Sequence, residues 1–303
     1  MKNLLSIFIS ANILFFTTPN FAQENENQEK PVETELYKLY KPDNPEAVLI
    51  LFGGFPETAE NIENGFPITK QALKKNVAVA YLNYNRKLWL EESDKSQLAS
   101  SIQEMITIND LPSDEIYFGG MSSGGNIALL IGNYLAQNQE YNLKPAGVFV
   151  IDSPVDIAAL YRISEQNIER NFSQASVGES SFMLNYFKAE LGNPDEEIKP
   201  YEKYLPFTYE TKNAQNLEDL KNTKLRFYTE PDKTWWKENM GIDYEQMNAF
   251  HVKRLSVFLT SNDFKKVEYI ATEGKGYRAN GARHPHSWSI VDKEDLLQWI
   301  VEE

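Results

Sequence analysis

The stretch YFGGMSSGGN, residues 117–126, decides the fold. It places four glycines around two serines, where an apolar run of strand type ends and an apolar run of helical type begins. Glycine is costly inside a strand or a helix, because it has more backbone freedom to lose on folding than any other residue. Four glycines at one junction therefore indicate a turn in which side chains have no room.

Gly120, Ser122 and Gly124 form the pattern G-x-S-x-G in this stretch. A serine forced onto a sharp strand-to-helix turn adopts a strained backbone, and the residues two positions on either side must be small because strand and helix pass close together. The predicted helix begins at the serine. Its free N–H groups and its dipole therefore face any negative charge that develops there.

Short β-branched or aromatic runs alternate with helical patterns along the rest of the chain, which predicts a mostly parallel sheet. Several runs are continuously apolar, as is typical of central parallel strands covered on both faces. The interval between Ile151 and Lys224 contains helical patches but no clear strand, and predicts a helical insertion over about 153–222. Strands are predicted over 35–40, 47–52, 77–83, 115–121, 146–151, 224–230 and 265–271, and helices over 90–110, 125–138, 242–261 and 290–301.

In strand order and in the G-x-S-x-G turn, the chain resembles the α/β-hydrolase superfamily. The resemblance implies a domain over 35–303 with a mostly parallel central sheet, helices on both faces and the insertion as a helical cap. It also implies a catalytic triad in the chain order serine, acid, histidine, with Ser122 as the nucleophile. The lipase-type H-G-G-G is absent, since Phe52 stands where its histidine would be.

The chain contains three histidines, His251, His284 and His286. The last two follow the final predicted strand, where the superfamily places its base. His286 is favoured because it lies next to the start of the final helix, and His284 remains an alternative. His251 is in register with Met247 and Leu255 on an apolar helix face, and is interpreted as a core or cap residue.

The resemblance places the acid after the penultimate predicted strand. Asp232 has the expected position just past the end of that strand, with Glu230 beside it as a second choice. Asp152 is a third choice, because some relatives take the acid from the end of the preceding strand. The sequence leaves these three carboxylates open and favours Asp232.

The chemistry follows from the pKa of a serine hydroxyl, which is too high for a good nucleophile at neutral pH. His286 would accept the proton of Ser122 and pass it to the leaving group, while Asp232 would fix the imidazole tautomer. Two backbone N–H groups would stabilise the oxyanion: that of Ser123 and that of Phe55, in the loop after the first buried strand.

Composition excludes several classes of function. The net charge of −14 disfavours nucleic acid, and the absence of cysteine excludes disulfides, a cysteine nucleophile and lipid attachment through cysteine. No metal-binding motif supports the His-Pro-His sequence, so neither metal nor cofactor is expected. Arg278 and Arg283, in a basic loop before the histidines, are candidate contacts for an anionic substrate group. Trp235 and Trp236, just past Asp232, are interpreted as buried beneath the cap.

Residues 1–22 have the pattern of a secretory signal peptide, with a basic start, an apolar run and Ala22 at a suitable cleavage position. A polar leader is predicted over 23–34. The apolar run is too short to span a bilayer comfortably, so the mature chain is expected to be secreted or periplasmic, with no membrane span.

Together these features predict an exported serine hydrolase that cleaves a small-molecule carboxylic ester through an acyl-enzyme. Two alternatives remain: a peptidase or amidase using the same triad, and a non-catalytic protein that binds a ligand or partner in the same cleft.

Overall fold

The computed structural model describes residues 30–84 and 86–302. Its strands form one sheet in the order β1-β2-β4-β3-β5-β6-β7-β8. Strands β3 to β8 are parallel, and β1 and β2 extend one edge in antiparallel pairing. The strands are β1 Val32–Glu33, β2 Tyr37–Tyr40, β3 Ala47–Phe52, β4 Val77–Leu82, β5 Ile116–Met121, β6 Pro145–Ile151, β7 Lys224–Thr229 and β8 Val267–Ala271.

Helices connect the parallel strands. The α-helices are α1 Ala59–Gly65, α2 Thr69–Leu73, α3 Glu92–Ile108, α4 Ser123–Gln137, α5 Ile157–Arg170, α6 Gln174–Glu190, α7 Lys199–Tyr204, α8 Lys233–Met240, α9 Asn248–Thr260 and α10 Lys293–Val301. Short 3-10 helices are η1 Gln139–Tyr141, η2 Gln215–Leu220, η3 Tyr244–Gln246 and η4 Trp288–Ile290.

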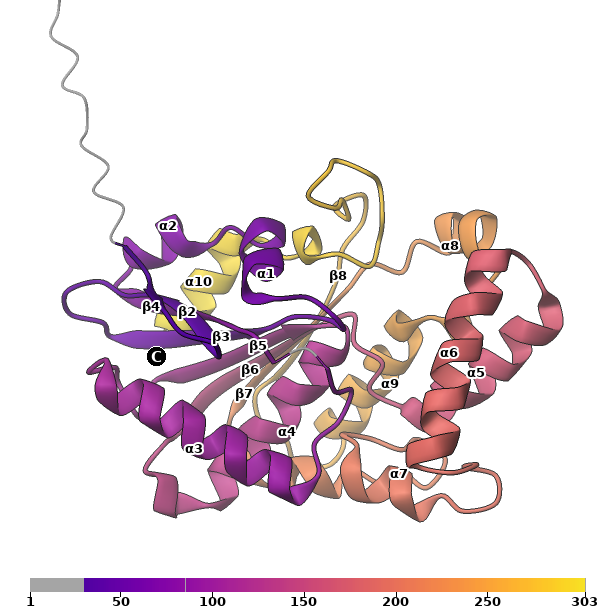
Figure 1. Cartoon of the computed structure of the whole chain (residues 1–303), viewed down its shortest axis with the longest axis horizontal. Helices are drawn as coiled ribbons and strands as arrows, with labels where there is room; N and C mark the ends of the chain where they lie inside the picture. Colours follow the sequence, from indigo (N-terminus) through magenta and orange to yellow (C-terminus); the bar gives the residue numbers. More distant parts are fainter. Residues whose placement is uncertain (1–29, 85, 303) are drawn as a thin grey trace, which may run out of the picture.

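Each face of the sheet is covered by its own hydrophobic cluster. Val48, Ile50 and Phe52 of β3 point into the cluster on the side of α3, α4 and α9, whereas Leu49 and Leu51 point into the other. Successive side chains of a strand point to opposite faces, so burial on both sides explains why the whole run is apolar. Figure 1 shows α1, α2 and α10 above the sheet, and α3, α4 and α9 below it.

The predicted fold class is confirmed, and each predicted strand is present. Helices α1, α2 and α8 were not expected from the sequence. The helix predicted over 242–261 is interrupted: η3 forms first, and Met247 has extended backbone (φ −85°, ψ 148°) before α9 begins. Val32 and Glu33, within the predicted leader, pair with Leu39 and Lys38 as an edge strand.

The interval between β6 and β7 contains α5, α6, α7 and η2. Helices α5, α6 and α7 lie at one end of the molecule, beside α8 and α9 (Figure 1). Within residues 30–84 and 86–302, no helix is long and apolar enough to cross a bilayer. The predicted signal peptide, residues 1–22, lies outside the described residues.

Candidate active site

Ser122 lies in the turn between β5 and α4, with φ 54° and ψ −130°. A positive φ is rare for a residue with a side chain, and such strain persists only where the surroundings enforce it. The N–H of Ser122 donates to the carbonyl of Ile151 over 2.9 Å, and the N–H of Gly125 donates to the carbonyl of Ser122 over 3.1 Å. Strand β6 and helix α4 therefore hold the turn from both sides.

The two glycines of the G-x-S-x-G pattern occupy positions without room for a side chain. A Cβ atom on Gly120 would lie 2.1 Å from the carbonyl oxygen of Gly124, and one on Gly124 would lie 2.2 Å from that of Phe52. Both obstacles are backbone atoms, which cannot turn away as a flexible side chain can. The turn thus depends on close contact between strand β3, strand β5 and helix α4.

Substituting Gly124 by alanine should lower the free energy of unfolding by about 2 kcal/mol, because the added methyl group forces the backbone apart. Gly178 is a matched control in α6, where a Cβ atom would meet no other atom within 4 Å. Gly178→Ala should leave stability unchanged or raise it by about 0.5 kcal/mol. Denaturant unfolding of both variants tests this, and equal stabilities would contradict the packing described.

His286 is paired with Asp152. Its Nδ1 atom lies 2.7 Å from Oδ2 of Asp152, whose side chain is buried. Asp152 follows β6 directly and has a positive φ of 44°. Its N–H donates to the carbonyl of Tyr228, and its carbonyl accepts a hydrogen bond from the side-chain amide of Asn248. These contacts from β7 and α9 fix the carboxylate beneath the imidazole.

The pairing of His286 with Asp232 predicted from the sequence is therefore wrong. Asp232 instead caps helix α8, accepting a hydrogen bond from the N–H of Trp235 over 3.0 Å, and forms an ion pair with Arg283 over 2.6 Å. The acid that faces His286 is Asp152, the third of the sequence-based choices. The physical reason is that the N-terminus of α8 and the guanidinium of Arg283 both bind the Asp232 carboxylate and hold it away from the histidine.

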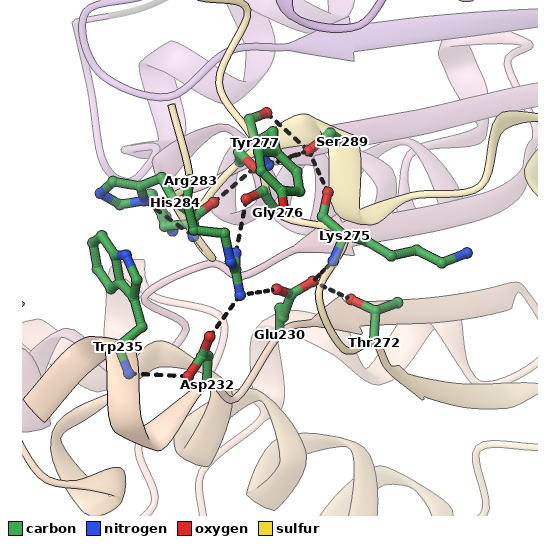
Figure 2. Close-up of polar contacts among 12 residues, drawn as sticks. Glu230, Asp232, Trp235, Thr272, Lys275, Gly276, Tyr277, Arg283, His284 and Ser289 are labelled. Carbon is green, nitrogen blue, oxygen red and sulfur yellow. Dashed lines mark hydrogen bonds and ion pairs between the residues drawn. The ribbon is translucent and has the colours of Figure 1, made fainter. Parts of the chain in front are cut away.

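The carboxylate of Glu230, the second choice, is also bound by groups other than His286. Figure 2 shows Arg283 between the carboxylates of Glu230 and Asp232. Glu230 is 2% exposed and also accepts hydrogen bonds from the hydroxyl of Thr272 and the N–H of Lys275. A buried carboxylate needs such partners, because losing them leaves an uncompensated charge. Arg283 thus anchors its own loop to these two carboxylates.

His284 has a different environment from His286. Its ring packs against Trp235, with centroids 4.6 Å apart, and its Nδ1 accepts a hydrogen bond from the N–H of His286 over 3.2 Å. Burial, followed by the positive charge of Arg278, lowers the pKa of His284 to about 4. The neutral ring of His284 accepts the backbone N–H of His286. It therefore helps to fix the segment that carries His286. Trp235 and Trp236 are half-buried beside it, and His251 is buried in the core.

The pKa of His286 is raised above its ordinary value of 6.5. Burial alone lowers it, but the hydrogen bond and the negative charge of Asp152 outweigh burial, since both favour the protonated ring. An imidazole in this environment is neutral above its raised pKa, and the carboxylate stabilises its protonated form.

The loop after β3 was predicted to offer the N–H of Phe55 to an oxyanion. That N–H donates instead to the hydroxyl oxygen of Ser123 over 2.9 Å. The neighbouring N–H of Gly54 donates to Oε2 of Glu57 over 2.8 Å. In the described structure both amides of this loop thus have side-chain acceptors, and the N–H of Phe55 becomes available only when the Ser123 hydroxyl gives it up.

Glu57 was missed by the sequence analysis. The same oxygen that accepts the N–H of Gly54 also accepts the indole N–H of Trp288 over 3.2 Å. One carboxylate therefore joins the loop of Phe55 to the segment that carries His286. Burial is the main cause of the raised pKa of Glu57. No local pattern marks this role, because Trp288 is distant in the sequence.

For the serine hydrolase predicted from the sequence, Glu57→Gln should lower kcat by about tenfold with little change in KM, because the loop predicted to supply the N–H of Phe55 loses a charged acceptor. The charge of Glu57 also raises the pKa of His286, so the acid limb of the kcat/KM profile should move to lower pH. Glu60→Gln is the control, since Glu60 is exposed on α1. A purely structural role for Glu57 would leave the acid limb in place.

One cavity of about 660 Å³ brings these groups together. Ser122, Ser123, Phe55 and His286 line it, and its apolar lining residues are Leu88, Pro154, Leu160, Ile163, Met183, Met240, Ile242 and Met247. Its polar lining residues include Asn61, Asn64, Glu57 and Arg278, and also Ser164, Asn167, Ser176, Glu179 and Ser180 of α5 and α6. The cavity has the size and composition typical of small-molecule sites.

No protein-family model matches the sequence, and no curated protein sequence matches it either. Solved structures do resemble it. An esterase structure from Rhizomucor miehei aligns with a TM-score of 0.53 at 15% identity, over 89% of this chain and 81% of that one. A putative esterase from Staphylococcus aureus aligns with a TM-score of 0.51 at 14% identity, over 90% and 83%.

The acylaminoacyl peptidase of Pyrococcus horikoshii aligns with a TM-score of 0.51 at 14% identity. The alignment covers 87% of this chain but 38% of that peptidase. At identities this low, the structural similarity shows a shared fold and no more. The likenesses, the parallel sheet and the serine turn at the end of β5 agree on one conclusion: this chain has the α/β-hydrolase fold.

Proposed function

We propose that this chain is a serine hydrolase that cleaves carboxylic esters through an acyl-enzyme. The observation that carries the proposal is the 2.7 Å contact between Nδ1 of His286 and the buried carboxylate of Asp152. A carboxylate at one ring nitrogen leaves the other nitrogen to serve as a base, and His286 lines the same cavity as Ser122. Two of the similar structures described above are named as esterases, which supports the ester reading.

In the proposed reaction the oxygen of Ser122 attacks the ester carbonyl while Nε2 of His286 takes the hydroxyl proton. Asp152 stabilises the imidazolium that forms. The N–H of Ser123, with that of Phe55 once it leaves the Ser123 hydroxyl, donates to the oxyanion. His286 then passes its proton to the alcohol oxygen as the C–O bond breaks. Water, deprotonated by His286, releases the acid from Ser122.

The cavity supports an ester with an apolar acyl group, because Leu160 and Ile163 of α5, Met183 of α6, and Met240, Ile242 and Met247 line it together. We propose that α5 and α6, within the interval 153–222, act as the cap over this cavity. A panel of nitrophenyl esters of increasing acyl length tests this, with the highest kcat/KM expected for chains longer than acetate. A preference for acetate would contradict the proposed contact with these apolar side chains.

A fluorophosphonate probe tests the nucleophile. The wild-type protein should be labelled at Ser122, and Ser122→Ala should not be labelled. Equal labelling of the two proteins, or none in either, would contradict a serine hydrolase and favour a binding protein with this fold. If the wild type hydrolyses aminoacyl anilides faster than esters, the same residues serve a peptidase.

We also propose that the chain is exported and cleaved after Ala22, on the basis of the signal pattern over 1–22. Sequencing of the N-terminus of the exported protein should then begin at residue 23. Material that begins at Met1 would contradict cleavage.

A further inference from the structure

A second pocket, of about 600 Å³, lies apart from the catalytic cavity and shares no lining residue with it. Helix α9 forms one side, and residues from η3 and from the turn at 208–213 complete it. Its lining includes the cations Lys212, Lys253 and Arg254. None of the described residues that line this pocket carries a carboxylate. In a chain of net charge −14, such a grouping of cations is unusual.

These cations form no direct ion pair among residues 30–84 and 86–302. Arg162, Arg226 and Arg283 each bind two carboxylates, whereas Lys212, Lys253 and Arg254 take part in no ion pair in the described part of the chain. Asp156 is the acid that acts on Arg254 electrostatically. Its carboxylate is buried and already accepts the N–H groups of Ala159 and Tyr209.

The guanidinium of Arg254 packs against two aromatic rings. Its guanidinium lies directly over the ring of Tyr209 and 4.9 Å from the ring centroid of Phe250. Arg254 is half-buried, and this burial lowers the pKa of its guanidinium. Stacking on aromatic faces leaves the N–H groups at the edge of the guanidinium free to bind a planar anion. A half-buried cation that has no ion-pair partner in the described part of the chain favours an anionic ligand.

Apart from Ser261 and Asn262, the remaining lining of the pocket is aromatic or aliphatic. Tyr244 and Phe258 line it, together with Val257, which is 58% exposed. Ring faces and an exposed aliphatic side chain favour a flat apolar group beside the charge. We propose that this pocket binds a small carboxylate that carries an aromatic ring, with Arg254 on the carboxylate and the rings of α9 and η3 on the aromatic group.

The probe is 2-naphthoate, titrated into the protein in a calorimeter at low salt, with 2-naphthamide as its uncharged counterpart. Naphthoate should bind with one-to-one stoichiometry and a Kd below about 1 mM. Naphthamide should bind at least about tenfold more weakly, because it lacks the charge that the three cations attract. Raising the salt concentration should weaken the binding of naphthoate.

Arg254→Gln should raise the Kd for naphthoate by about tenfold or more, and Lys253→Gln by a smaller factor. Thermal unfolding shows whether Arg254→Gln is folded. If it is not, Lys253→Gln still tests the pocket, because Lys253 is exposed and its substitution should not disturb the fold. Lys265→Gln makes the same charge change outside the pocket and should leave the Kd unchanged. Arg278→Gln, in the catalytic cavity, should also leave it unchanged.

The proposal is overturned if naphthoate does not bind at several millimolar, or if it binds Arg254→Gln and Lys253→Gln as tightly as wild type. It is also overturned if Arg278→Gln abolishes binding, because the ligand would then occupy the catalytic cavity. These outcomes are independent of esterase activity, which Arg254→Gln should retain.

Discussion

Replacing Asp152 with asparagine should lower kcat by about 10⁴-fold while leaving the fold intact. The reason lies in the contact between Asp152 and Nδ1 of His286, which is short and buried. An amide has no charge to stabilise the imidazolium, and it stabilises the wrong tautomer of the neutral ring by donating to Nδ1. Ester turnover measured beside thermal unfolding separates this loss from a loss of structure.

The pH profile of the same variant provides a second readout. In the wild type, kcat/KM should fall as the pH decreases through the raised pKa of His286, because the base must be neutral to accept a proton. Asp152 raises that pKa, so Asp152→Asn should move the acid limb of the residual activity to lower pH. An unchanged limb would mean that another carboxylate holds the imidazole.

Asp232→Asn is the matched control, since it makes the same chemical change at the carboxylate that the sequence favoured. It should retain most of the turnover, because Asp232 contacts Arg283 and Trp235 but not His286 in the described structure. Full activity in Asp152→Asn together with a large loss in Asp232→Asn would contradict the site described above.

Replacing His286 with alanine should have the largest effect, a loss of kcat of about 10⁶-fold, as expected when a triad loses its base. His284→Ala should retain much of the activity, because His284 contacts Trp235 and the N–H of His286 rather than the cavity that Ser122 lines. Single-turnover kinetics with an activated ester would measure both. A larger loss in His284→Ala would transfer the role of base to that residue.

The sequence was most informative where the structure is local. The G-x-S-x-G turn depends on glycines within a few residues of Ser122, and each buried strand shows its own apolar run. Short helices were missed for a related reason: α1 and α2 are too brief to show a clear helical period. The start of α8 was readable in principle, because Asp232 caps it and Gly241 follows its last turn.

The identity of the acid that pairs with His286 depends on contacts between residues that are distant in the sequence. Strands β6 and β7 are neighbours and end at the same edge of the sheet, and each is followed by a carboxylate. Which one reaches His286 depends on a distant residue, Arg283, that draws Glu230 and Asp232 to itself (Figure 2). The role of Glu57 likewise depends on Trp288, from the other end of the chain. Such contacts exist only once the sheet has assembled.

The most direct measurement is the proton NMR spectrum of His286 at low field. A short hydrogen bond from an imidazole N–H to a buried carboxylate shifts the proton far downfield and protects it from exchange with water. The wild type and Asp232→Asn should both show this resonance, and Asp152→Asn and His286→Ala should lack it. A resonance that persists in Asp152→Asn but disappears in Asp232→Asn would contradict the arrangement on which the proposed reaction depends.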